Sequence, residues 1–176
     1  MLFSKTPHDC GSNRIAEAAQ NITADIIVNV QGDEPFTDSE ALEKLLQVFK
    51  NDSAMATDLA SIMHPINDKI DIENPNNVKV IVDTDGHALY FSRLPLPFNR
   101  ATENKVQYYK HQGIYAFRKQ ALLDFYALAP TPLEIAEKIE CLRFLEYGKK
   151  IKMVVHDKPS IGIDTPEDLE EARKRV

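Results

Sequence analysis

Apolar residues recur along this chain in two spacings, and the alternation between them predicts strands and helices in turn. Residues 25–30 form a short, nearly continuous apolar run, which is typical of a buried parallel strand. Residues 12–21 and 42–49 instead repeat apolar side chains every three or four positions, the spacing of a helix that is buried on one side. Residues 37–40 have capping-box spacing and predict the start of the second helix.

The rest of the chain continues this alternation. We expect further strands at 55–63, 78–82, 88–91, 108–117 and 151–155, and further helices at 119–128, at 133–147 and from 165 onward. The strands 78–82 and 88–91 flank an Asp-Thr-Asp-Gly turn and therefore predict a hairpin. Pro132 suits the first position of a helix that Gly148 ends. The predicted fold class is α/β, a mostly parallel sheet with an antiparallel hairpin insertion, in one domain spanning residues 1–176.

Composition narrows the functional classes. With 176 residues, 43% of them hydrophobic and 27% charged, the chain resembles an ordinary soluble globular domain. A net charge of -6 gives no electrostatic basis for nucleic-acid binding. The two cysteines, Cys10 and Cys141, fit a reducing cytoplasm better than a disulfide framework. No apolar run reaches membrane-spanning length, so we expect no membrane association.

Two acidic segments are candidates for metal chemistry. The strand at 25–30 stops at Gln-Gly-Asp-Glu-Pro-Phe, and the carboxyl ends of strands are where ligands bind in open α/β sheets. Asp33 lies in this segment, and Asp164 follows a second strand-like stretch. Each acid alone is also typical of a solvated loop or a helix cap. Together they offer the carboxylate oxygens that Mg²⁺ prefers, so the sequence indicates a Mg²⁺ site held by Asp33 and Asp164.

Several longer segments resemble one family. The strings VNVQGDEPF at 28–36, FSR at 91–93 with prolines after it, YKHQGIY at 109–115, EKIECLR at 137–143 and DTPEDL at 164–169 are similar to segments of the 3-deoxy-manno-octulosonate (Kdo) cytidylyltransferases. The resemblance implies a Rossmann-like nucleotidyltransferase sheet. It also implies catalytic, metal-holding roles for Asp33 and Asp164. It assigns sugar binding to a set drawn from four of these segments: Gln31, Arg93, His111, Tyr115 and Glu140.

Two segments match the family less closely. Residues 8–14 resemble its nucleotide-side segment, which assigns nucleotide binding to Gly11 and Arg14. Cys141 stands where the family usually has glutamine, and a thiol is a poor substitute for an amide as a hydrogen-bonding group. His64, His87 and His156 have no matching context, and we interpret them as structural or surface residues.

The resemblance implies transfer of CMP from CTP to Kdo, giving CMP-Kdo and pyrophosphate for lipopolysaccharide biosynthesis, by a Mg²⁺-dependent cytoplasmic homodimer. Two alternatives stay open: another sugar-acid nucleotidyltransferase, such as a CMP-sialic acid type, or a non-catalytic dimerising or sugar-binding remnant. Complete members begin with a strand and a Gly-rich turn that this sequence lacks before residues 6–14. We therefore expect an N-terminally truncated member that alone forms CMP-Kdo poorly or not at all.

Overall fold

The helices and strands follow the predicted order. The computed structural model describes residues 7–8, 10–101, 103, 105–158, 162–163 and 165–174. Within them the helices are α1 (Gly11–Ala19), α2 (Ser39–Asn51), α3 (Lys69–Glu73), α4 (Lys119–Ala127), α5 (Pro132–Glu137), α6 (Cys141–Glu146) and α7 (Pro166–Arg173). The strands are β1 (Ile26–Asn29), β2 (Leu59–Ile66), β3 (Lys79–Val82), β4 (Ala88–Ser92), β5 (Tyr108–Arg118) and β6 (Ile151–Val155). No helix of these ranges is long and apolar enough to span a bilayer.

The sheet is mixed, and the expectation of a mostly parallel sheet is not confirmed. Its order is β4-β3-β5-β2-β6, with β1 paired to β5. The long strand β5 runs antiparallel to β1, β2 and β3, and β3 and β4 form the predicted antiparallel hairpin. Among the named strands, only β2 and β6 pair in parallel. The apolar content of β1 reflects burial on its two faces, which does not determine the direction of its partner strand.

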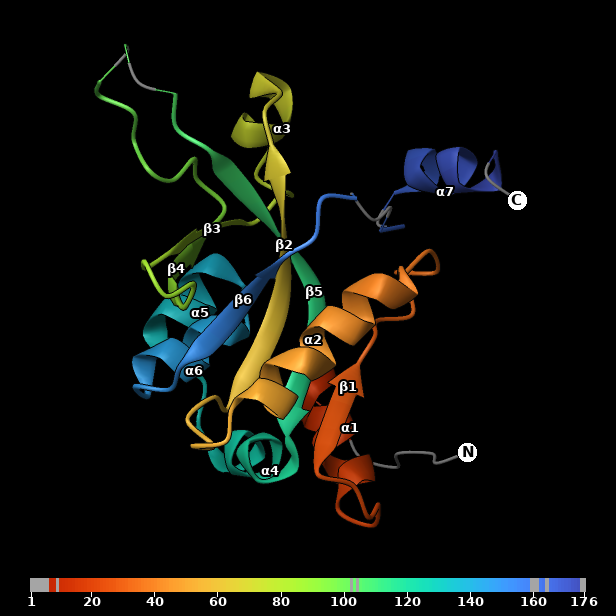
Figure 1. Ribbon diagram of the computed structural model, residues 1–176. Helices are drawn as coiled ribbons and strands as arrows, with labels where there is room; N and C mark the ends of the chain where they lie inside the picture. The colour runs from red at the N-terminus through yellow and green to blue at the C-terminus, as the bar shows by residue number, and fades with distance from the viewer. Residues whose placement is uncertain are drawn as a thin grey trace.

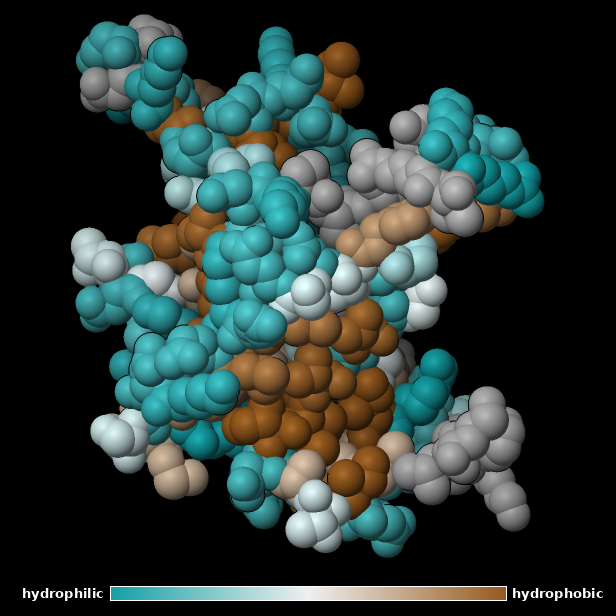
Figure 2. All heavy atoms as spheres, turned by 45° about the vertical axis from the view of Figure 1, so that its right-hand side comes forward, coloured by the Kyte–Doolittle hydropathy of each residue, from teal (hydrophilic) through white to brown (hydrophobic). Residues whose placement is uncertain are grey.

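Helices cover both faces of this sheet (Figure 1). On one face α2 packs through Ala41, Leu45 and Phe49 against the middle of β2 and β5. The other face is covered by α1, α4 and α6, whose buried side chains join those of β2, β5 and β6 in the larger core cluster. Apolar side chains also gather on the surface over α2 and β1 (Figure 2), beside a groove that includes Ile26 and Leu46.

Some element boundaries differ from the predicted ones. The first strand after α2 begins at Leu59 rather than at residue 55. The N-cap of α2 is Asp38, whose carboxylate accepts the backbone N–H of Glu40. The helix therefore begins one residue later than the predicted capping box places it, and Ala41 at the third helical position cannot complete such a box. The short helix α3 had no recognised periodicity.

The predicted helix 133–147 is in fact two helices. Lys138 adopts a left-handed backbone conformation with φ of 56°, and this ends α5 before α6 begins at Cys141. A non-glycine residue in this region carries backbone strain, so the surrounding structure must hold it there. Gly148, with φ of 73°, ends α6 as predicted.

On one edge of the central strand β5, a short stretch lies between its pairing with β1 and its pairing with β3. The last residues of β5 pair with β1 up to Tyr115↔Asn29, and its first residues meet β3 at Lys110↔Lys79. Residues 112–114 lie between these two pairings. On the other edge, β2 steps from Ser61↔Tyr115 to Ile62↔Gln112, so β5 carries two extra residues, Gly113 and Ile114, in a bulge. Bulges of this kind redirect side chains and occur often beside functional sites.

A buried ion pair joins α5 to α6. Arg143 is 1% exposed, and its Nη2 and Nε donate to the two carboxylate oxygens of Glu134 at 2.6 and 2.7 Å. The guanidinium carbon also lies 4.5 Å from the centroid of the Phe125 ring. The pair therefore anchors the two short helices to each other and to α4.

We predict that Glu134→Ala lowers the free energy of unfolding by about 3 kcal/mol, because it leaves a buried guanidinium without its counter-charge. Urea denaturation followed by circular dichroism measures this. Glu170→Ala, which removes the exposed ion pair with Arg173, serves as the control and should change stability by less than about 0.5 kcal/mol. Equal effects of the two substitutions would contradict the anchoring role.

Candidate functional site

A cleft of about 630 Å³ opens at the gap beside β5. Segments far apart in sequence form its walls, from the start of α1 to the start of α7. Its lining residues are Cys10, Gln31, Asp33, Glu34, His64, Asn74, Asn76, Asn77, Val78, Lys110, His111, Gln112, Gly113, Tyr115, Lys138, Ile139, Glu140, Gly162 and Thr165. Five sequence-predicted site residues therefore share one cleft: Gln31, Asp33, His111, Tyr115 and Glu140.

The β5 bulge sets the floor of this cleft through a buried hydroxyl. Ser61 is fully buried, and its Oγ lies 2.9 Å from the carbonyl oxygen of Ile114 and 2.8 Å from Nε2 of His111. A carbonyl oxygen can only accept, so the hydroxyl proton is donated to it, and the hydroxyl oxygen accepts from the protonated Nε2. This leaves Nδ1 of His111 as a hydrogen-bond acceptor.

The histidine is held as a neutral group. Its ring packs edge-on against Phe91, with 4.9 Å between centroids, and in a tilted arrangement against Tyr115, with 5.5 Å between centroids. Burial, and then the neighbouring His64, lower the pKa of His111 to about 3. At neutral pH it therefore offers hydrogen bonding to a ligand without adding charge.

A buried phenol and a carboxylate lie on the wall next to His111. Tyr115 is 6% exposed, and burial raises its pKa well above the ordinary value. Glu140 precedes α6 and accepts a hydrogen bond of 2.9 Å from the hydroxyl of Ser12 in α1. Cys141 does not line the cleft and is buried in the core, in keeping with its poor match to a sugar-binding amide.

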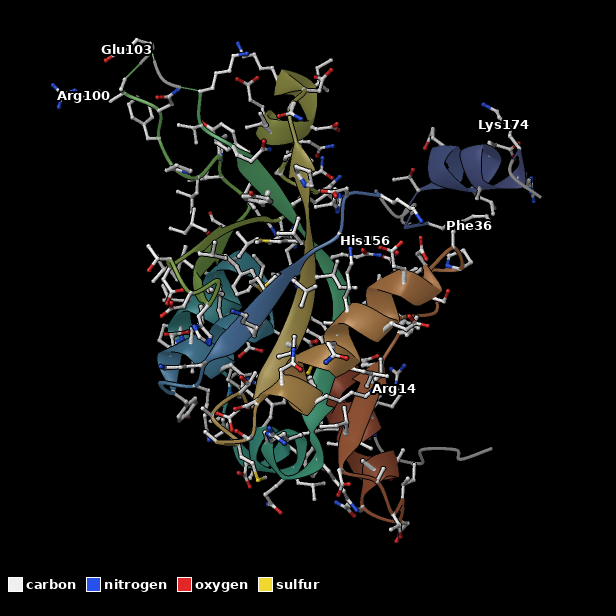
Figure 3. The ribbon with its side chains drawn as sticks, in the orientation of Figure 1. Arg14, Phe36, Arg100, Glu103, His156 and Lys174 are labelled. Atoms are coloured by element: carbon white, nitrogen blue, oxygen red, sulfur yellow. The ribbon has the colours of Figure 1, made fainter. Side chains whose placement is uncertain are left out.

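The acidic end of the cleft is built from the loop after β1. Asp33 is exposed, while Glu34 accepts a hydrogen bond of 3.0 Å from the amide Nε2 of Gln112 on β5. The backbone N–H of Ile163 donates to the carbonyl oxygen of Asp33 at 2.8 Å. Asp164 lies outside the described residues, so its pairing with Asp33 stays a prediction. This loop continues to Phe36, which Figure 3 shows below α7.

Of the two residues expected to bind the nucleotide, Gly11 lies against a residue of the cleft lining and Arg14 does not line the cleft. A Cβ at Gly11 would lie 3.0 Å from Nε2 of Gln31, so glycine lets α1 begin against the amide that lines the cleft. Arg14 is exposed on α1 and is absent from the cleft lining; Figure 3 shows it beside β1.

Arg93 also lies outside the cleft lining, so the structure does not bring it together with His111 and Glu140. Its Nε donates to the carbonyl oxygen of Glu137 at 2.7 Å, and its Nη1 donates to that of Pro75 at 2.9 Å. The planar fork expected to bind a substrate carboxylate is thus directed at main-chain oxygens.

Sequence reasoning missed part of the lining. His64 was interpreted as structural, yet it lines the cleft, and burial with nearby Lys110 lowers its pKa to about 4. Lys138 was hidden inside a predicted helix. No site role was predicted for Asn74, Asn76 and Asn77, although their three side-chain amides are groups that can bind hydroxyls.

The described residues contain one other group with metal-like spacing, away from the cleft. Asp83, Asp85 and His87 lie together in the β3–β4 turn. The Asp83 carboxylate accepts the backbone N–H groups of Asp85 and His87 at 2.9 and 2.8 Å, which explains the cluster as a turn cap.

We predict that stability falls as the pH drops from 6.5 to 5. In the unfolded chain the side chains of His64 and His111 take up a proton near pH 6.5. In the folded protein burial keeps them neutral until about pH 4 for His64 and about pH 3 for His111. Each histidine therefore contributes a slope of up to about 1.4 kcal/mol per pH unit in this window. Urea denaturation at a series of pH values measures it. The His64→Met variant should show a shallower slope, and an unchanged slope would contradict the assignment.

Comparison with known proteins identifies the family of this chain. The model of a family described as cytidylyltransferase matches residues 1–151. Two curated proteins, both named 3-deoxy-manno-octulosonate cytidylyltransferase, are close in sequence. The one from Christiangramia forsetii is 63% identical over 174 residues, covering 99% of this chain and 70% of the relative. The one from Flavobacterium johnsoniae is 57% identical, covering 98% of this chain and 70% of the relative.

Solved structures give the same result. The structure of CMP:2-keto-3-deoxy-manno-octonic acid synthetase complexed with CTP has a TM-score of 0.88 at 38% identity, covering 96% of this chain and 68% of the other. A 4-diphosphocytidyl-2C-methyl-D-erythritol synthase from Anaerococcus prevotii, 17% identical with a TM-score of 0.56, shares the fold. The chain therefore belongs to the cytidylyltransferase family and, within it, to the 3-deoxy-manno-octulosonate cytidylyltransferases.

Proposed function

We propose that this protein transfers CMP from CTP to Kdo, giving CMP-Kdo and pyrophosphate for lipopolysaccharide biosynthesis. The proposal rests on the observation that one cleft contains both a group of acids suited to a metal ion and a group of hydrogen-bonding side chains suited to a sugar. Asp33 and Glu34 supply an acidic end, while His111, Tyr115 and Glu140 supply a wall of hydrogen-bonding groups. The relatives and the CTP-bound structure bear names that specify this reaction.

The acidic end suits a divalent cation. Asp33 is exposed and offers a hard oxygen ligand of the kind that Mg²⁺ takes together with water and phosphate oxygens. Asp33, with Asp164 as the expected second ligand, would hold the ion. When bound there, Mg²⁺ supplies positive charge beside the phosphates of CTP.

The chain's own residues orient the sugar. The carboxylate of Glu140 accepts from sugar hydroxyls, and Nδ1 of the neutral His111 accepts from another. Held in this way, the anomeric hydroxyl gives up its proton to solvent and its oxygen attacks the α-phosphorus of CTP. The bond between the α-phosphorus and the oxygen that bridges to the β-phosphorus breaks, and pyrophosphate leaves with that oxygen. The cations that line the cleft, Lys110 and Lys138, take the role expected of Arg93 and offset the carboxylate of Kdo.

In the chain extended by the Gly-rich turn with which complete members of the family begin, Asp33→Asn should lower pyrophosphate release from CTP and Kdo in the presence of Mg²⁺ by at least about 100-fold, because it removes a charged ligand at the phosphate end. Asp25→Asn changes an exposed aspartate outside the cleft and is the control. A panel of sugar acids that includes sialic acid tests the sugar, and a rate with sialic acid equal to that with Kdo would reject Kdo specificity. An unchanged rate for Asp33→Asn would reject the metal role.

We further propose a cytoplasmic homodimer formed through the hairpin and the loop that follows it. The loop between β4 and β5 extends from the body of the domain, with Arg100 and Glu103 near its tip (Figure 3). Phe98 on this loop is 86% exposed, Leu94 is 70% exposed, and Leu89 on the hairpin is also exposed. Large apolar side chains gathered on a projecting segment are typical of an association surface. A cytoplasmic location fits a reaction that uses CTP.

Phe98→Glu should therefore shift the protein from dimer to monomer in sedimentation velocity, because it places a charge in the proposed apolar interface. Tyr126→Glu changes an exposed aromatic residue on α4 and is the control. A wild-type chain that sediments as a monomer at all accessible concentrations would contradict the dimer.

A further inference from the structure

Behind one wall of the cleft lies a buried lysine that has no carboxylate within hydrogen-bonding distance among the residues that the structure describes. Lys79 is 0% exposed. Its Nζ donates to the carbonyl oxygens of Asn74 at 2.9 Å, Asn77 at 2.5 Å and Arg93 at 2.6 Å. An ammonium group has three N–H donors, and each here has one acceptor. A neutral amine would offer only two, so the three carbonyls favour the charged form, whereas burial and then the charge of Arg93 act against it and lower the pKa of Lys79.

Arg93 connects the same loop to the end of α5. Its guanidinium bridges the carbonyl oxygens of Pro75 and Glu137. Its backbone N–H donates to the Glu137 carboxylate at 3.0 Å, and that carboxylate also accepts the hydroxyl of Ser92 at 2.7 Å. Lys79, Arg93 and Glu137 thus form a single clamp, which we call the carbonyl clamp.

The carbonyl clamp holds two walls of the cleft from outside. One wall is the loop 74–77, whose asparagines face the cleft, and the other is the segment 138–140 after α5. The loop 74–77 lies outside the sheet ladder. The Asn74 carbonyl oxygen accepts the backbone N–H of Asn77 at 3.1 Å in addition to the Lys79 ammonium, while Lys79 and Arg93 donate to the carbonyl oxygens of Asn77 and Pro75. Lys138 begins the second wall in its strained left-handed conformation. A clamp of charged donors is suited to keeping both segments in place.

Asn76 offers the clearest contact on the held loop. It is exposed and lines the cleft. Its backbone N–H donates to the Asn74 side chain, whereas its own amide has no partner among the residues that the structure describes. An amide both donates and accepts, which suits a sugar hydroxyl.

We propose, on the basis of the function proposed above, that Asn76 is a specificity-determining contact for a hydroxyl of the sugar acid, and that Lys79 and Arg93 are positioning residues that hold its loop and the segment 138–140 in place. Neither cation touches the substrate in this arrangement. Their role is to fix the distance between the two walls.

Hydrogen–deuterium exchange of the ligand-free full chain tests the carbonyl clamp. Lys79→Met and Arg93→Gln should each raise exchange at residues 74–78 and 138–140 by at least about tenfold, since each lost charged hydrogen bond is worth roughly that factor. Exchange in the centre of β2 and β5 should stay at the wild-type rate. Arg93 is only half-buried, so its variant tests the clamp even where Lys79→Met fails to fold.

Matched controls exist elsewhere in the chain. Lys119 donates to the carbonyl oxygen of Ile22 at 2.6 Å, and Arg118 donates to that of Thr57 at 3.0 Å, both outside the cleft. Lys119→Met and Arg118→Gln should leave exchange at 74–78 and 138–140 unchanged. Unchanged exchange in Arg93→Gln, or equal increases in the controls, would overturn the clamp.

Titration calorimetry with Kdo tests the sugar contact. Asn76→Ala should weaken Kdo binding by about tenfold at unchanged melting temperature. Asn21→Ala, at an exposed asparagine beyond α1, should bind as the wild type does. Wild-type affinity in Asn76→Ala would overturn the contact. A wild-type chain that binds no Kdo would overturn it together with the proposed function, while the ligand-free exchange measurement would still decide the clamp.

Discussion

The cleft depends on one buried hydroxyl at an irregularity in the central strand. β5 carries two extra residues, Gly113 and Ile114, where its register with β2 shifts. Ser61 on β2 donates its hydroxyl to the Ile114 carbonyl oxygen in this bulge and at the same time fixes the ring of His111. One small side chain therefore connects the distortion of the sheet to the orientation of a group in the site. An alanine there would remove the hydroxyl partner of Nε2 of His111 and of the carbonyl oxygens of Gln112 and Ile114.

The cleft lining combines both signs of charge. Asp33 and Glu34 come from the loop after β1, Glu140 and the cations Lys110 and Lys138 come from other walls, and burial keeps His64 and His111 neutral. An imidazole that titrated near pH 7 would alter this field under ordinary conditions. The depressed pKa values of His64 and His111 keep the field constant, which suits a site for two anionic substrates.

The sequence allowed most elements and part of the site to be predicted. Asp33 could be placed because a glycine and a proline mark the end of its strand. The direction of β1 could not, because apolar content reports burial and not the partner strand. The break at Lys138 was missed because helical periodicity continues through it and no glycine or proline marks it. Arg93 was expected at a substrate carboxylate because its fork suits one, but tertiary structure supplied main-chain oxygens instead.

The cleft lining extends in sequence from Cys10 to Thr165, nearly the whole described chain. A substrate bound there therefore acts as a non-covalent crosslink between the first helix and the last. It can bind only after the intervening strands have assembled, so the free energy of binding stabilises the whole folded domain against unfolding rather than one local element. The bound state should then be resistant to local opening at both ends of the chain at once, which would slow proteolysis at sites remote from the ligand.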